Sequence, residues 1–197
     1  MKANDNTKIK KVPFSVIPQR IKMQGLYRID IFWTHLLDAL QGYKKNYNLE
    51  LTPAFQRGHV WSKDQQIKYI EFILGGGITG KDIYFNYPGW GNDWEPDLQM
   101  VCVDGLQRLT AATEFMRNKF QVFGKYYAEN FIRLDMRCGF KLHINDLKTE
   151  KDILQWYVEM NAGGTPHSNA EIQKVRQMIN QADKSGYREC PEPHHPE

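Results

Sequence analysis

A predicted junction between a strand and a helix lies in the middle of the chain and limits the folds that the chain can adopt. Residues 99–103 form a short, largely apolar run suited to a strand, and residues 106–116 carry apolar side chains at helical spacing. Asp104-Gly105 stands between them, so this pair is predicted at a strand-to-helix turn. Free backbone N–H groups and the positive end of the dipole make the start of a helix an anion site.

Other segments predict a mixed order of elements. Helical spacing predicts one helix at residues 31–40 with Asp30 as its N-cap, and another from Ser62 or Lys63 to Leu74, capped by Ser62 and stopped by the glycines at 75–77. Residues 83–86 are expected to pair with 99–103 as a hairpin with a long loop. Further strands are predicted at 120–122, 131–135 and 141–144, and closing helices at 151–160 and 168–179. This order indicates an α+β fold.

Length and composition favour one compact unit. The chain has 197 residues, of which 41% are hydrophobic, and this suits a single core. We see no internal repeat. Residues 1–11 and 183–197 lack an apolar pattern and are predicted to be flexible, which leaves 12–182 as the folded domain.

Charge and cysteine content narrow the class of protein. The 26 Lys and Arg against 23 Asp and Glu leave a net charge of +3, so DNA binding is permitted but not implied. Three widely spaced cysteines suit reduced thiols rather than disulfides or a zinc site. No stretch approaches the roughly 18 apolar residues of a membrane span. We therefore expect a soluble cytoplasmic protein.

The predicted turn carries side chains suited to a phosphate. Gly105 lets a ligand approach the backbone, and Arg108 can grip a phosphate with two donors. Asp104 can hold Mg²⁺, orient a water molecule or cap the helix. The competing interpretation, which an arbitrary Asp-Gly pair favours, makes Asp104 an N-cap and Arg108 a solvated residue.

A second cluster lies about fifty residues upstream. Residues 53–62 include Gln56 and Arg57 and again end at a predicted helix start. If the two clusters face one ligand, Arg57 and Arg108 neutralise its phosphates together. We therefore expect the Arg57 guanidinium to point into the same concavity as Asp104 and Arg108.

Three ordered motifs carry a family resemblance: Phe55-Gln56-Arg57 with Val60-Trp61, then Val103-Asp104-Gly105-Leu106-Gln107-Arg108-Leu109-Thr110, then Asn161-Ala162-Gly163-Gly164-Thr165-Pro166. Over residues 36–175 the chain resembles the DGQQR-motif family found at the N-terminus of GmrSD-type modification-dependent restriction enzymes, a branch of the ParB/sulfiredoxin-like superfamily. The resemblance implies a compact α+β domain with a small mixed sheet and flanking helices. It also implies a nucleotide site, with nucleotide hydrolysis coupled to DNA restriction in the larger relatives.

The resemblance assigns roles to individual residues. Those expected at the nucleotide are Gln56, Arg57, Gly105, Gln107, Arg108, Thr110 and Asn161. Asp104, Arg108 and Arg57 are the expected catalytic residues, with Mg²⁺ at Asp104. Leu106 replaces the first glutamine of the motif. The predicted loop has no cysteine of the sulfiredoxin kind, which disfavours thiol chemistry. A C-terminal HNH-type nuclease region is not expected in these 197 residues, nor is autonomous DNA cleavage.

Two further segments each have a structural and a functional interpretation. The segment 84–94 holds five aromatic residues, which can stack on bases or dock a protein partner, although a packed hairpin is the favoured interpretation. Asn161–Pro166 with His167 and Ser168 reads as a turn into a helix capped by Ser168. The histidines lack a repeated ligand spacing, and no structural zinc is predicted.

The leading hypothesis is an NTP-binding protein that hydrolyses the nucleotide or transfers a phosphoryl group with Mg²⁺. Its setting would be DNA restriction, DNA modification or phage–host conflict. One alternative is a non-catalytic module that senses a nucleotide or DNA. Another is a DNA-binding or nicking protein that lacks its nuclease partner.

Overall fold

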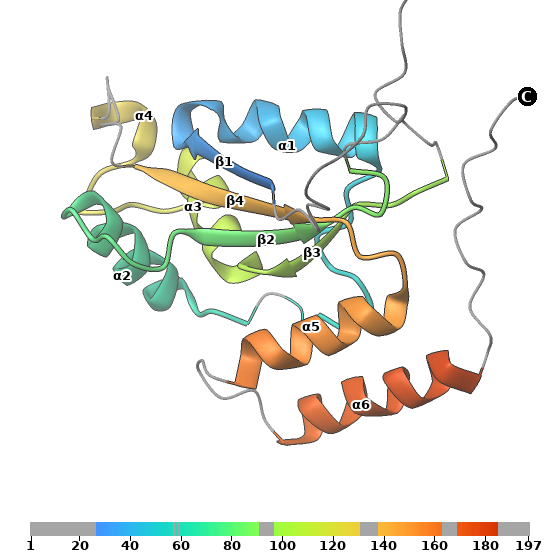
Figure 1. Ribbon diagram of the computed structural model, residues 1–197. Coiled ribbons are helices and arrows are strands. Elements are labelled where there is room, and N and C mark those ends of the chain that lie inside the picture. Colours follow the sequence, from blue (N-terminus) through green and yellow to red (C-terminus); the bar gives the residue numbers. More distant parts are fainter. Residues whose placement is uncertain are drawn as a thin grey trace, which may run out of the picture.

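A computed structural model describes residues 27–56, 58, 60–90, 97–130, 138–162 and 169–184. A four-stranded sheet with strand order β1-β4-β2-β3 forms the centre, and helices pack on both of its faces (Figure 1). In chain order the elements are β1 (Tyr27–Phe32), α1 (Trp33–Tyr47), α2 (Lys63–Leu74), β2 (Asp82–Asn86), β3 (Val101–Asp104), α3 (Leu106–Met116), α4 (Tyr127–Asn130), β4 (Gly139–Asn145), α5 (Glu150–Ala162) and α6 (Asn169–Lys184). The predicted α+β fold with a small mixed sheet and flanking helices is confirmed. Membership of the ParB/sulfiredoxin-like superfamily stays a prediction.

The sheet is mixed because β4 lies between strands of opposite direction. β1 runs antiparallel to β4, whereas β2 runs parallel to it. β2 and β3 form the expected antiparallel hairpin, with a register shift between Tyr84 and Phe85. The predicted strands at 83–86, 99–103 and 141–144 are thus confirmed, with ends that differ by one or two residues.

Alternation along the strands decides what each face of the sheet carries. In β4, Phe140, Leu142 and Ile144 are buried in the larger core together with side chains from α1, α2 and α3. Their neighbours Lys141 and His143 project from the opposite face, since successive side chains of a strand alternate. A smaller cluster on that opposite face joins α5 and α6 to β3. The sheet therefore has one fully apolar face and one face that is partly polar.

The start of α2 agrees with its prediction in detail. The Ser62 hydroxyl accepts a hydrogen bond from the Gln65 N–H, and the Gln65 side chain accepts one from the Ser62 N–H. This reciprocal capping box satisfies two otherwise unpaired donors. The helix ends at Gly75, the first of the three glycines predicted to stop it.

The first helix begins later than predicted. Asp30 is not its N-cap but lies within β1, and the N-cap is Phe32, which makes no side-chain cap bond. The physical reason is that exposed Arg28 and Asp30 alternate with the partly buried Ile29 and Ile31. That period of two suits a strand on a half-buried sheet, and pairing with β4 selects it.

One predicted strand is wrong, and some predictions fall outside the described residues. At 120–122 the chain forms only an isolated bridge between Val122 and Lys125, around a turn in which Phe123 and Gly124 have positive φ. Residues 131–135 lie outside the described part, as do the predicted flexible segment 1–11 and nearly all of 183–197. The two closing helices are confirmed, and α6 continues to Lys184. None of the described helices is long and apolar enough to cross a membrane.

Candidate functional site

The β3–α3 turn has the geometry expected from the sequence. Asp104 is the last residue of β3, Gly105 is the N-cap of α3, and Arg108 lies in the first turn of that helix. Gly105 has φ 100°, and a Cβ atom there would lie 2.6 Å from the Ile83 Cδ1 atom and 3.2 Å from the Asp82 carbonyl oxygen. Only glycine fits, because the position combines left-handed backbone with close contact to β2.

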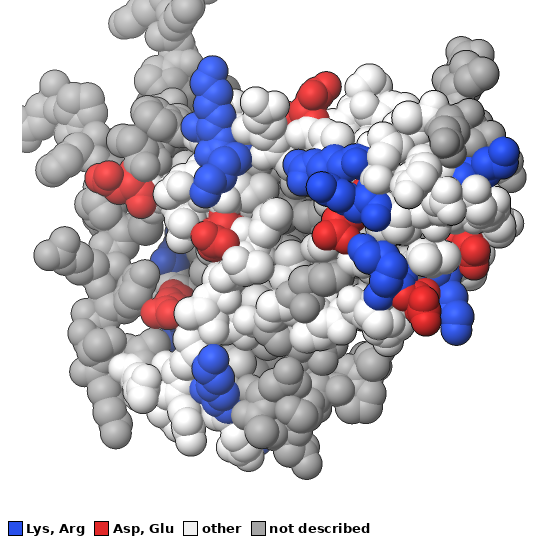
Figure 2. Space-filling view, turned by 180° about the vertical axis from the view of Figure 1, so that it is seen from behind, with Lys and Arg blue, Asp and Glu red and all other residues white. Residues whose placement is uncertain are grey.

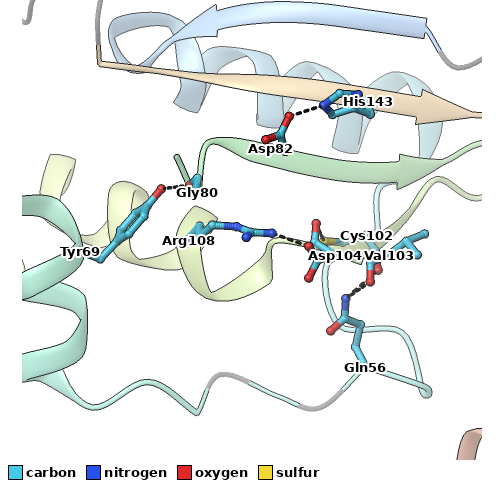
Figure 3. Close-up of polar contacts among 9 residues, drawn as sticks. All are labelled: Gln56, Tyr69, Gly80, Asp82, Cys102, Val103, Asp104, Arg108 and His143. Carbon is cyan, nitrogen blue, oxygen red and sulfur yellow. Dashed lines mark hydrogen bonds and ion pairs between the residues drawn. The ribbon is translucent and has the colours of Figure 1, made fainter. Parts of the chain in front are cut away.

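Asp104 and Arg108 form an ion pair one helical turn apart. The Arg108 Nη2 atom donates to Asp104 Oδ2 (Figure 3). The two side chains remain 24% and 36% exposed, for Arg108 and Asp104 respectively. The Arg108 Nε atom is buried and has no hydrogen-bond partner within the described part of the chain. The guanidinium thus keeps donors that Asp104 does not use.

The starts of α2 and α3 differ in how their backbone donors are satisfied. The capping box of Ser62 and Gln65 satisfies donors at the start of α2. At the start of α3 the N-cap is Gly105, which has no side chain, and there is no acidic residue in the first turn. Asp104 is therefore not the cap that the competing interpretation required. Within the described residues, α3 keeps the positive end of its dipole without a capping side chain.

Gln107 ties this turn to the loop before α2. Its Oε1 atom accepts hydrogen bonds from the N–H groups of Val60, at 2.9 Å, and Trp61, at 3.1 Å. Its Nε2 atom donates to the Gly58 carbonyl oxygen at 3.1 Å. The whole amide is thus engaged with backbone, so the two motifs predicted to face one ligand do lie side by side.

Gln56 makes the reciprocal connection to β3. Its Nε2 atom donates to the carbonyl oxygens of Val103, at 2.8 Å, and Cys102, at 3.2 Å (Figure 3). Arg57 itself lies outside the described residues, so the expected direction of its guanidinium stays a prediction. Its neighbours Gln56 and Gly58 are each bonded to the β3–α3 unit.

A row of polar side chains crosses the sheet beside Asp104. In register, Arg28 of β1 stands opposite His143 of β4, His143 beside Tyr84 of β2, and Tyr84 opposite Asp104. The Tyr84 and His143 rings stack with centroids 4.4 Å apart. Burial, then the Asp82 and Asp104 carboxylates, raise the pKa of Tyr84, which the Arg108 guanidinium opposes. Tyr84 therefore belongs to the electrostatic surroundings of the Asp104–Arg108 pair.

The sequence predictions did not include this row. The signal was the alternation in β2, where Asp82 and Tyr84 interrupt the buried Ile83 and Phe85. Asp82 Oδ1 lies 2.7 Å from His143 Nε2, and His143 is only 5% exposed (Figure 3). A polar pair at alternate positions of neighbouring strands marks one face, but the pairing of β2 with β4 was needed to bring them together.

The Cys102 thiol and the Tyr69 hydroxyl are buried groups that interact electrostatically with residues of the β3–α3 turn. The pKa of Cys102 is raised by burial and then by the Asp104 carboxylate, which keeps the thiol protonated. Its side chain is fully buried. The Tyr69 hydroxyl donates to the Gly80 carbonyl oxygen at 2.7 Å, and burial raises its pKa while Arg108 lowers it. A buried, protonated Cys102 is a poor nucleophile, in line with the expectation against thiol chemistry.

The remaining predicted residues have the following positions. Thr110 lies in the second turn of α3, half-buried, and its carbonyl oxygen accepts from the Thr113 hydroxyl at 3.1 Å. Asn161 is in the last turn of α5, but its side chain lies outside the described part, as do residues 163–168. Their contacts with a nucleotide stay predictions.

The aromatic residues of the β2–β3 hairpin are mostly packed. Phe85 and Tyr87 are buried. The Trp90 ring lies 5.3 Å from Tyr47 and 5.4 Å from Tyr27, centroid to centroid. Trp94 lies outside the described residues. The packing favours the hairpin interpretation for the described rings, and a protein partner at 84–94 stays a prediction.

Charge on the far side of the molecule is mixed. Figure 2 shows Lys and Arg side chains interspersed with Asp and Glu on the face turned away in Figure 1. Among the described residues, no three His, Cys, Asp or Glu side chains are grouped to hold a metal ion. Asp104 is therefore not part of such a group in the described residues, and it suits Mg²⁺ only if a ligand supplies further oxygens.

Comparison with known protein families identifies a match over more than half of the chain. The family model described as the GmrSD restriction endonuclease, N-terminal domain, matches residues 36–142. The match covers the Gln56 segment, the β3–α3 turn, β2 and the first part of β4. Searches of curated proteins and of solved structures found no significant match.

Proposed function

Because the chain belongs to the family of the GmrSD restriction endonuclease N-terminal domain, we propose that its β3–α3 turn binds the phosphates of a nucleoside triphosphate. One observation carries the proposal: among the described residues, the buried Nε atom of Arg108 has no hydrogen-bond partner, and no side chain caps the helix start beside it. Both features attract an anion, and a guanidinium can grip a phosphate through two donors.

The residues of the turn divide the work. Arg108 and the backbone N–H groups at the start of α3 bind phosphate oxygens, and Gly105 makes the left-handed turn that places this helix start directly after β3. Gln107 and Gln56 hold the loop 58–61 and β3 together through backbone contacts, so they position the site. Arg57, flanked by these anchors, supplies the second guanidinium. Thr110 and Asn161 contribute at the edge of the nucleotide.

The ion pair couples phosphate to metal. In the structure Arg108 neutralises Asp104. A phosphate that takes over Arg108 leaves the Asp104 carboxylate free to hold Mg²⁺, together with phosphate oxygens. The metal, when bound, neutralises charge that develops on the phosphates. Asp104 would then orient a water molecule, whose attack releases phosphate and a nucleoside diphosphate, or a hydroxyl that accepts the phosphoryl group, and this reaction would be coupled to DNA restriction.

The same ion pair also supports a second function. A carboxylate already bound to Arg108 is less available for chemistry, so the turn would serve equally in a non-catalytic module that senses a nucleotide or DNA. The mixed charge in Figure 2 gives a DNA-binding role little electrostatic support on that face.

Calorimetric titration with each of the four NTPs, with and without Mg²⁺, tests binding. Arg108→Ala should weaken binding roughly 10- to 100-fold, because it removes charge-assisted hydrogen bonds. The matched control is Arg117→Ala, an exposed arginine at the other end of α3. Equal loss in both variants, or no binding by the unmodified chain, would reject the site.

Phosphate release separates catalysis from sensing. Asp104→Asn keeps the side-chain shape but removes the charge, so it should abolish release while leaving much of the affinity. A second outcome is that the unmodified chain binds the nucleotide saturably but releases no more phosphate than a mock preparation, even with DNA added. That result would reject the proposed hydrolysis and support the sensing module. Melting curves of each variant show whether it is folded.

A further inference from the structure

β1 forms one edge of the sheet (Figure 1). Two backbone hydrogen bonds of neighbouring residues show which N–H and C=O groups of β1 point toward β4. The Trp33 N–H donates to the Cys138 carbonyl oxygen at 2.9 Å. The Lys141 N–H points away from β1 and donates to the carbonyl oxygen of Lys81, the residue before β2, at 2.9 Å. Backbone groups alternate in direction along an antiparallel strand. Tyr27, Ile29 and Ile31 therefore bond to β4, whereas the N–H and C=O groups of Arg28 and Asp30 point outward.

The side chains of β1 divide between the two faces of the sheet. Ile29 and Ile31 pack against the larger core, and Tyr27, which is 50% exposed, leans on Trp90. Arg28 and Asp30 are exposed on the other face. In the described residues no strand or side chain bonds to the outward groups, so the edge offers an unpaired hydrogen-bonding row.

We propose that β1 is a dimerisation strand, which pairs antiparallel with β1 of a second copy about a two-fold axis at Ile29. In this register Arg28 stands opposite the second copy's Asp30, and Asp30 opposite its Arg28. These are the residues whose N–H and C=O groups point outward, so each opposed pair exchanges two backbone hydrogen bonds. An isologous contact of this kind closes as a dimer.

Both faces of the joined sheet are complementary in this register. On the core side Tyr27 meets the second copy's Ile31, and Ile29 meets its own equivalent, so every pair is apolar or aromatic with β-branched. On the polar side Asp30 already stands opposite Lys141 of β4. In the dimer the second copy's Arg28 would lie on its other side, so positive and negative side chains would alternate from strand to strand. Opposite charges directly across strands stabilise the pairing.

Charge also rejects the neighbouring registers. An axis at Arg28 places two arginines opposite each other, and an axis at Asp30 places two aspartates opposite each other. A register shift of one residue, which places Arg28 opposite the second copy's Ile29, would bring polar side chains onto the apolar face of the joined sheet. Charge thus favours the axis at Ile29 over the axes at Arg28 and Asp30.

Charge exchange tests this register directly by sedimentation equilibrium of the full chain over about a hundredfold concentration range. The unmodified chain should show a dimer that dissociates on dilution, because a two-strand contact is small. Arg28→Asp and Asp30→Arg each create two like-charge pairs and should weaken association roughly tenfold or more. Lys45→Asp, an exposed change on α1, controls for net charge.

Two restorations make the test specific. The double variant R28D/D30R should associate like the unmodified chain. An equimolar mixture of the two single variants should form mixed dimers, although neither associates well alone, because each supplies the charges that the other lacks. A monomeric unmodified chain, unchanged association in either single variant, or failure of the mixture to restore it, with all variants folded by circular dichroism, would overturn the proposal.

Discussion

The two edges of the sheet are finished in different ways. Along β3 the chain closes its own edge: the Glu50 N–H donates to the Met100 carbonyl oxygen at 2.8 Å, and the Cys102 N–H donates to the Glu50 carbonyl oxygen at 2.9 Å. Gln56 then bonds to Val103. Beside β1 the described residues provide no such cover. The edge that carries the candidate site is closed within the chain, whereas the edge far from it is open in the described part of the chain.

The difference predicts that substitutions at the two edges change different properties. The closed edge holds the β3–α3 turn in place, so its residues should affect the free energy of unfolding. On the open edge the side chains of Arg28 and Asp30 are exposed, so these two residues should affect association. A substitution that changes both the free energy of unfolding and association would contradict this separation.

The largest effect is expected where the closed edge turns into α3. Gly105→Ala should lower the free energy of unfolding by about 3 kcal/mol, because left-handed backbone and contact with Ile83 both penalise a side chain. Gly76→Ala is the control, since it has φ 96° but nothing within 4 Å, and should cost about 1 kcal/mol. Urea denaturation measures both. Equal losses would show that contact with β2 does not matter.

A smaller loss is expected from the amide that joins the two motifs. Gln107→Leu removes three hydrogen bonds to residues 58–61 and should cost about 1 to 2 kcal/mol. Gln56→Leu removes two bonds to β3 and should cost about 1 kcal/mol. If either change leaves urea midpoints unaltered, the closed edge does not depend on these amides.

The free energy of unfolding should decrease at alkaline pH because the Cys102 thiol of β3 and the Tyr69 hydroxyl of α2 are buried. Burial raises the folded-state pKa of the Cys102 thiol above its ordinary value of 9.0, and likewise that of Tyr69 above 10.0. The unfolded chain loses these protons first, so the free energy of unfolding should fall as pH rises past 9 and fall further past 10. Cys102→Ala should flatten the first part of that decline. A stability profile equally steep in the variant would contradict this assignment.

The smallest effect on stability is expected at the open edge. Arg28→Ala and Asp30→Ala should change the free energy of unfolding by less than about 0.5 kcal/mol when measured at concentrations that keep the chain monomeric. Both residues are exposed and lie on the polar face. A loss comparable to that of Gln107→Leu would mean that β1 depends on these charges within one chain, and the contrast between the edges would fail.

Local patterns explain which parts of the fold were predictable. The start of α2 follows from Ser62 and Gln65, and the β3–α3 turn from Asp104-Gly105, because caps and turns depend on a few adjacent residues. β1 was missed because its six residues become a strand only through pairing with β4. Sequence near Asp30 also fits a helix cap, and no local pattern distinguishes the two.

The candidate site shows the same limit. The sequence indicated Asp104, Gly105 and Arg108, and these residues meet at one turn as expected. Backbone contacts of Gln107 and Gln56 depend on loops about fifty residues apart, so their positioning role was hidden. Tyr84 and His143 come together only because β2 lies parallel to β4.

The position of β4 in the sheet has a consequence for how the chain folds. β2, β3 and α3 are near neighbours in sequence, and their contacts can form early, whereas β1 must wait for a partner about 110 residues further along. During synthesis at roughly 5 to 20 residues per second, β1 would therefore remain unpaired for on the order of ten seconds. Arg28 and Asp30 interrupt its apolar residues over that interval. Charges that set the register of the finished strand would thus also keep the nascent strand from pairing indiscriminately.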